Sequence, residues 1–259
     1  IYIEEGMQNV CERNEKESVL AKQLGLLKQV RLACQTKIKG DVKVRRLVLD
    51  QIDEEIILKQ DVDHSARSLG VEKEASILFV DIADYTAFTE KTPPYDVVHI
   101  LNKYFYIAGN IIKKYGGRIV DYYGDGFLAI FGIDDNPDHA QNLMNAGFEL
   151  CEAIDKFDVA VHDIIDSDFK IRLGAHTGKV IWGTIGIEGM QKEAAIGDTV
   201  NMASRIEQAN KTLNTSFLIS SDLFEKLEGQ CRCQESFEIE AKGKSKKIRV
   251  HAVNRHLVR

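Results

Sequence analysis

The feature that most constrains the fold is a pair of β-forming runs, RIVDYY and FLAIF, that meet at Gly124, Asp125 and Gly126. A Gly-Asp-Gly junction between such runs indicates a hairpin. The run ILFVDI (77–82) is typical of a buried strand, and residues 97–117 carry apolar side chains at helical spacing before a Gly-Gly stop. Because helices alternate with strands that pair as hairpins, the sequence favours an α+β fold, with helices packed on the sheet, over a doubly wound parallel sheet.

The texture of the chain divides it into three parts, a small β-rich module (1–50), a helical linker (51–75) and a large domain (76–255). In the first, the apolar runs IYI and RRLVL flank the helix-like stretch KESVLAKQLGLL. In the large domain we expect helices over 139–158 and 198–210, two strands joined by a tight turn over 169–186, a strand and short helix over 216–227, and a terminal strand pair over 235–254.

Composition excludes several classes of protein. The net charge of −6 over 259 residues leaves no global basic field for nucleic acid. No run approaches the length of a membrane-spanning helix, and no secretory signal is visible. Five irregularly spaced cysteines are typical of a reducing compartment, so we expect a cytoplasmic protein. The first residue is Ile rather than Met, and we expect a piece of a longer protein.

Two carboxylates stand at strand ends. Asp81 follows the run ILFV, and Asp125 lies at the hairpin tip. Mg²⁺ is commonly held by two carboxylates, with substrate phosphates and water filling its other positions. Each residue also has a simpler interpretation, Asp125 as a turn residue and Asp81 as a cap. Asp84, beyond the strand end, and Asp121, within a strand, are weaker metal candidates.

Four motifs in order, FVDIADYTAFTE, GGRIVDYYGDGFLAIFG, IRLGAHTGKVIWGTIG and AIGDTVNMASRIE, resemble the class III adenylate and guanylate cyclases over residues 76–255. The resemblance implies a ferredoxin-like or palm-like sheet, mostly antiparallel, with flanking helices. It also implies conversion of ATP to 3′,5′-cyclic AMP and pyrophosphate, in signal transduction, by a head-to-tail homodimer with two equivalent sites.

The resemblance assigns roles to individual residues. Asp81, Asp125 and the Ile82 carbonyl would bind two Mg²⁺ ions, for which Mn²⁺ would substitute. Asn201 would orient the ribose and Arg205 would stabilise charge on the α-phosphate, both reaching the site from the partner chain. The triphosphate would be held by backbone amides and cations, namely the amides of Ile82, Ala83, Asp84, Tyr85 and Thr86 with Arg172 and Lys242. Lys244 is the alternative to Lys242, and His176 is expected to be a packed strand-end histidine.

The base-reading positions depart from the family pattern. Adenylate cyclases usually carry Lys, and guanylate cyclases Glu, where this chain has Asp121. The partner position holds Ala194, whose side chain forms no hydrogen bond with a base. An anionic Asp121 could accept protons from guanine, or point to solvent while backbone groups read adenine. ATP is the narrowly preferred substrate, with GTP as the alternative.

The segment VRLACQTKIKGDVKVRRL resembles the C-terminal part of a plant-type [2Fe–2S] ferredoxin. Cys34 would be one cluster ligand, but a cluster needs four, and the other three are not in this chain. A cluster is therefore expected only in a longer parent chain, in which residues 51–75 would couple a redox module to the cyclase. The alternative is a small β-rich module with a buried cysteine.

Two rival functions stay open. A catalytically silent cyclase homologue that binds nucleotide and regulates a partner would explain Asp121 and Ala194. It would not explain the intact Asp81, Asp125, Asn201 and Arg205. A diguanylate-cyclase or polymerase-like palm shares the two carboxylates but lacks its own signature turn here and leaves Asn201 and Arg205 without a role.

Overall fold

The computed structural model describes residues 1–23, 26–46, 70–162, 168–186, 189–229, 231, 233–240 and 247–254. The chain divides into two compact units. The first comprises residues 1–71 and 183–192, and the second comprises residues 72–182 and 193–259.

In the first unit, β1 (Tyr2–Glu5) pairs antiparallel with β2 (Lys43–Arg45), and the unit contains a short 3₁₀ helix, η1 (Met7–Asn9), and α1 (Glu15–Gln23). A buried ion pair organises it. The Arg31 guanidinium donates to the Glu17 carboxylate at 2.8 Å, and both side chains are 1% exposed. A buried pair of this kind is weak evidence for stability, but loss of one partner leaves an uncompensated buried charge. The expected helix over 16–27 is present as α1, and residues 26 and 27 are not helical.

The large unit is built on one sheet whose strands run in the order β4-β5-β3-β6-β8-β10-β9, with β7 paired to β6. Its strands are β3 (Val71–Ile82), β4 (Arg118–Tyr123), β5 (Gly126–Phe131), β6 (Ile171–Ile185), β7 (Lys192–Ile196), β8 (Phe217–Ser220), β9 (Cys233–Glu240) and β10 (Lys247–Val253). The β6–β8 pair is parallel, whereas β3–β5, β4–β5, β8–β10 and β9–β10 are antiparallel. The expected mostly antiparallel α+β sheet is confirmed.

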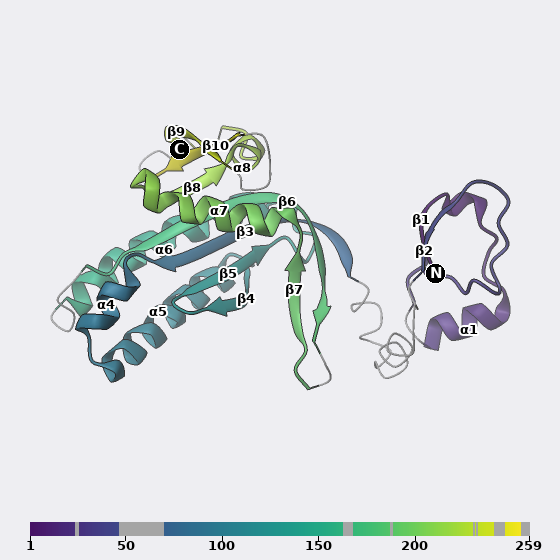
Figure 1. Cartoon of the computed structure of the whole chain (residues 1–259), viewed down its shortest axis with the longest axis horizontal. Coiled ribbons are helices and arrows are strands. Elements are labelled where there is room, and N and C mark those ends of the chain that lie inside the picture. Colours follow the sequence, from purple (N-terminus) through teal and green to yellow (C-terminus); the bar gives the residue numbers. More distant parts are fainter. Residues whose placement is uncertain are drawn as a thin grey trace. The chain divides into compact units, whose positions relative to one another are not determined.

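Helices cover both faces of this sheet (Figure 1). They are α4 (Tyr85–Lys91), α5 (Pro94–Lys114), α6 (His139–Val161), α7 (Asp198–Leu213) and α8 (Ser221–Lys226). Alternate residues of β3 divide between the faces: Leu78 and Val80 pack with α5 and α6, whereas Ala75 and Ile77 share a cluster with Ala203 of α7. This period of two is the geometry of a strand buried on both sides. Within the described ranges, no helix is long and apolar enough to cross a membrane.

The expected tight turn within residues 169–186 is wrong. The segment forms one long strand, β6, and Gly174 serves packing rather than a turn. A Cβ atom on Gly174 would lie 2.1 Å from the Glu207 amide nitrogen, so the missing side chain lets α7 approach the strand closely. The hairpin partner β7 was not expected, because the run KEAAI is short and adjoins a helix signal.

The expected linker helix over 51–75 is also wrong at its end, because β3 begins at Val71. Strand pairing within the sheet extends this polar stretch, which alone has the composition of an amphipathic helix. Residues 51–69, with the proposed pairing positions Ile52, Ile56, Ile57 and Val62, lie outside the described residues.

Candidate functional site

The strand register brings Asp81 and Asp125 together. Val80 of β3 pairs with Phe127 of β5, so the next residue of β3, Asp81, lies beside the β4–β5 turn that carries Asp125. The two carboxyl groups line the same cavity, close enough for the charge of Asp125 to act on Asp81. Burial, and then the negative charge of Asp125, raise the pKa of Asp81 to about 6. Two acidic groups that repel each other at one point form an arrangement that a divalent cation stabilises.

The turn that carries Asp125 is held by close packing. A Cβ atom on Gly126 would lie 2.7 Å from the Val80 carbonyl oxygen and 2.5 Å from the Tyr123 ring, so no larger residue fits without a shift. The Tyr123 hydroxyl lies within hydrogen-bond distance of the carbonyls of Val80 (3.2 Å) and Phe127 (3.0 Å). The side chain therefore ties the turn to β3, which fixes the position of Asp125 relative to Asp81.

The loop after Asp81 turns sharply into α4. Asp84 has φ +56°, in the left-handed region, and forms no side-chain cap on the helix. The Ala83 amide donates to the Lys170 carbonyl at 2.8 Å. That amide already has a partner within the chain. Of the amides from Ile82 to Thr86 that were expected to bind the triphosphate, the Ala83 amide is therefore not free to do so.

Arg172 lies near the start of β6 and reaches this loop. Its Nη2 atom lies 3.3 Å and 3.4 Å from the two carboxylate oxygens of Asp84, and its side chain is 18% exposed. A cavity of about 290 Å³ gathers most of the expected metal and phosphate residues with three residues of α7. Its walls are formed by Asp81, Ile82, Asp84, Tyr85, Thr86, Asp125, Arg172, Glu207, Gln208 and Lys211.

Glu207 is a cavity residue that sequence reasoning missed. It lies on α7 and is 7% exposed. Burial, with the negative charge of Asp81 as the next cause, raises the pKa of Glu207 to about 7. The available signal was its place in the helix, because it falls in the buried stripe formed by Ala203, Ile206 and Asn210. An acidic residue in a buried stripe has the placement expected of a site residue.

The expected pair Asn201 and Arg205 lies nearer the N-terminus of α7 than Glu207 does. Asn201 is exposed and Arg205 is half-buried. Their spacing of four residues places both on one face of the helix. Both are described residues, and neither lines the cavity around Asp81. One chain therefore does not gather all the expected catalytic groups around one cavity.

Of the two base-reading candidates, one lies in an expected strand and the other in a strand that was not expected. Asp121 lies in β4, beside an irregularity in its pairing with β5, and Ala194 lies in β7. His176 is half-buried, and its Nδ1 atom is 2.8 Å from the Ser220 hydroxyl, as a packed strand histidine would be. Lys242 and its alternative, Lys244, lie outside the described residues.

The cluster-ligand role of Cys34 stays a prediction. The Cys34 side chain is exposed. Cys11 is a different case, since its sulfur accepts a hydrogen bond from the Lys37 amide at 3.1 Å, and this bond lowers the pKa of the thiol. Over the described part of the chain, no three histidine, cysteine or acidic side chains are arranged to hold a metal ion. Two carboxylates at Asp81 and Asp125 suit an ion whose other ligands are substrate and water.

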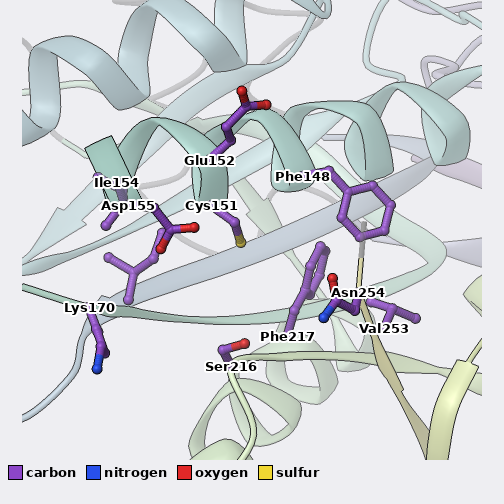
Figure 2. A pocket seen from close by; sticks show the side chains of 11 residues that line it. Phe148, Cys151, Glu152, Ile154, Asp155, Lys170, Ser216, Phe217, Val253 and Asn254 are labelled. Carbon is purple, nitrogen blue, oxygen red and sulfur yellow. The ribbon is translucent and has the colours of Figure 1, made fainter. Parts of the chain in front are cut away.

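A second cavity, of about 480 Å³, lies against α6 (Figure 2). Phe148, Cys151 and Asp155 line it from the helix, Lys170 lines it from the residue before β6, and Phe217 lines it from β8. Burial raises the pKa of the Cys151 thiol to about 12, so the thiol stays protonated and is a poor nucleophile at neutral pH. None of the expected site residues that the structure describes lines this cavity.

Comparison with known proteins agrees with this geometry. The family described as "Adenylate and Guanylate cyclase catalytic domain" matches residues 70–255. Adenylate cyclase 1 of Rhizobium meliloti is 29% identical over 182 residues, which cover 70% of this chain and 27% of that protein. The adenylate cyclase of Anabaena cylindrica is 31% identical over 198 residues, which cover 75% and 38%.

A solved structure shows the same fold. The crystal structure of the guanylyl cyclase Cya2 superposes with a TM-score of 0.66 at 28% identity, covering 71% of this chain and 93% of that one. The chain matches about a third of the length of the two curated relatives. Sequence match, fold and the gathering of Asp81, Asp125 and Arg172 all agree: this chain belongs to the family of adenylate and guanylate cyclase catalytic domains.

Proposed function

We propose that this chain converts ATP into 3′,5′-cyclic AMP and pyrophosphate, as a cytoplasmic homodimer in signal transduction. The observation that carries the proposal is the Asp81–Asp125 pair. Two partly buried carboxyl groups meet where β3 lies beside the β4–β5 turn, in a cavity that also holds Arg172. That donor set fits metal ions completed by phosphate and water.

Asp81, Asp125 and the carbonyl of Ile82 would hold two Mg²⁺ ions, with Mn²⁺ as a substitute. When bound, these ions would lower the pKa of the ribose 3′-hydroxyl and neutralise charge on the triphosphate. The raised pKa of Asp81 belongs to the metal-free pair, since a neighbouring cation favours the ionised carboxylate.

The other residues bind and orient the nucleotide. Arg172 would contact phosphate oxygens in the cavity that it shares with the metal carboxylates. Asn201 would hold the ribose, and Arg205 would stabilise charge on the α-phosphate as the pentavalent transition state forms. Lys242 would bind the outer phosphates.

Two copies of the chain would complete each site. Asn201 and Arg205 do not line the cavity that holds the carboxylates of their own chain. A head-to-tail dimer would bring them to the carboxylates of the partner, and the same symmetry would form a second, equivalent site.

The base specificity is the least constrained part of the proposal. Asp121 carries a negative charge on β4, which suits donors on guanine, and Ala194 on β7 offers no side-chain hydrogen bond. GTP is therefore the alternative substrate. The experiment is a side-by-side assay of the purified dimer with Mn²⁺ and ATP or GTP, with separation of the cyclic products.

Three outcomes separate the candidates. Cyclic AMP as the main product supports the proposal, and cyclic GMP shifts the assignment to a guanylate cyclase. No cyclic product from either nucleotide would favour a silent nucleotide-binding homologue. Asp81→Ala should abolish turnover and leave the dimer intact, so residual turnover in this variant would refute the metal assignment.

A further inference from the structure

We propose that Asp84 is an internal anion that occupies Arg172 in place of a phosphate group, and so weakens binding of the triphosphate. The proposal rests on the proposed function, because it assigns a role to a residue of that same site. It names a residue that sets affinity for the substrate without touching the reacting atoms.

The contact itself is the first observation. The Arg172 guanidinium faces both carboxylate oxygens of Asp84 at 3.3 Å and 3.4 Å, and both residues line the cavity that holds Asp81 and Asp125. A planar guanidinium pairs equally well with a carboxylate or a phosphate. The Asp84 carboxylate therefore takes up the Nη2 donor of Arg172, which a phosphate oxygen could use instead.

The backbone explains why the Asp84 side chain is available for this contact. An aspartate at the start of a helix normally has extended backbone angles and accepts a hydrogen bond from an amide in the first turn. Asp84 instead has φ +56° and forms no cap bond with α4. Aspartate is one of the few non-glycine residues that tolerate this left-handed conformation, and here the conformation accompanies a side chain that is turned toward Arg172.

The charges around the cavity indicate that the contact weakens, rather than strengthens, binding of the triphosphate. Four acidic side chains line it, from Asp81, Asp84, Asp125 and Glu207, against two cationic side chains, from Arg172 and Lys211. Divalent cations would offset the charges of Asp81 and Asp125. Asp84 interacts with Arg172 instead, so its charge opposes an incoming triphosphate and also competes for the guanidinium.

The contact is weak enough to exchange. Its distances are long for a charge-assisted hydrogen bond, and the Asp84 side chain is 68% exposed. Exposed pairs of this kind contribute little, so a phosphate group displaces the carboxylate without unfolding the loop. The expected effect on affinity is correspondingly a few-fold.

The decisive variant is Asp84→Asn, which keeps the size and the tolerance for left-handed backbone angles while it removes the charge. Asp168→Asn is the matched control. Asp168 forms an exposed ion pair with Lys170 at 2.6 Å and does not line this cavity. Asp84→Gly removes the charge and the backbone strain together, so it should shift affinity in the same direction.

Binding of inorganic tripolyphosphate and of 3′-deoxy-ATP, which has no 3′-hydroxyl, is measured by titration calorimetry with Mn²⁺. KM and kcat are measured with ATP and with GTP. We expect Asp84→Asn to lower the dissociation constant and KM about two- to fivefold, with kcat unchanged. Asp168→Asn should leave all of these values at wild-type levels. In an Arg172→Gln background, Asp84→Asn should lose most of its effect, since the two residues act as a pair.

The outcomes separate this inference from the proposed function. Unchanged or weaker tripolyphosphate binding in Asp84→Asn, or the same gain in the Arg172→Gln background, overturns the role of Asp84. A wild-type chain that forms no cyclic nucleotide, yet binds tripolyphosphate more tightly after Asp84→Asn, overturns the proposed function and leaves the role of Asp84 standing. A wild-type chain that neither cyclises nucleotide nor binds tripolyphosphate contradicts both.

Discussion

Asp81 and Asp125 lie side by side in one cavity, at the point where β3 meets the β4–β5 turn. The pairing of Val80 with Phe127 dictates this proximity, and Tyr123 and Gly126 hold the turn against β3. Burial and the Asp125 charge raise the pKa of Asp81 to about 6, so a proton and a metal ion compete for the same pair.

This competition predicts a pH dependence of metal binding. Since Asp81 holds a proton below its pKa of about 6, Mn²⁺ affinity should rise as the pH increases through that value. Titration calorimetry in two buffers with different ionisation enthalpies would count the released protons. We expect release near pH 5.5 and almost none near pH 8. Asp125→Asn should reduce the release only in part, because burial is the larger cause of the raised pKa of Asp81. An affinity that is constant across this range would contradict the assignment.

Glu207 predicts a pH dependence of stability in the metal-free protein. Its pKa rises from 4.5 in the unfolded chain to about 7 in the folded one, so the folded state binds the extra proton between these values. Its contribution to stability is full below pH 4.5 and is lost as the pH rises through about 7. Urea unfolding across this range should show the decline, and Glu207→Gln should flatten it, apart from the smaller share due to Asp81. A Glu207→Gln profile parallel to the wild type would show that another group is responsible.

Two tyrosines near the site, the buried Tyr104 and the partly exposed Tyr123, allow a comparison of hydroxyl removal. Among the described residues, the Tyr104 hydroxyl has no hydrogen-bond partner and is fully buried. Tyr104→Phe should therefore leave the free energy of unfolding unchanged or raise it by about 1 kcal/mol. Tyr123→Phe loses the contacts with the carbonyls of Val80 and Phe127, so it should lower that free energy by about 1 kcal/mol. Chemical denaturation of both variants measures the difference, and equal effects would contradict this account.

Arg205→Ala should lower kcat by well over tenfold with little change in nucleotide affinity, because its contact forms chiefly in the transition state. A steady-state assay separates the two values. An equal loss in affinity would make Arg205 a ground-state binding residue.

Shared sites predict complementation between inactive variants. Asp81→Ala and Arg205→Ala damage different sets of residues, which one chain does not gather in one cavity. A mixed dimer would then contain one site with both defects and one intact site. Mixing equal amounts should restore about a quarter of wild-type activity if subunits exchange freely. Native mass spectrometry would verify the exchange, and absent recovery in verified mixed dimers would place all catalytic groups within one chain.

Local sequence patterns predicted most elements of the large unit. The β4–β5 hairpin, the helices α5, α6 and α7, and the terminal β9–β10 pair all carry periodicities that burial of one face requires. The patterns failed over residues 169–186, where the expected turn is absent and β6 runs without a break. Gly174 within this strand lets α7 approach closely, which is a tertiary role that local patterns do not reveal. The start of β3 was missed for a similar reason, since pairing within the sheet outweighed its polar composition.

The sequence by itself determined the order of the motifs, the residue types of the site and the placement of Asp81 and Asp125 at strand ends, because these depend on neighbouring residues. Only the tertiary structure decided which side chains share the cavity. Glu207, Lys211 and the Asp84–Arg172 pair are brought there by contacts between distant segments, and no spacing along the chain encodes the distance or burial that shifts a carboxyl pKa. The carboxylate pair was thus a prediction of the sequence, and the charges that surround it are a property of the fold.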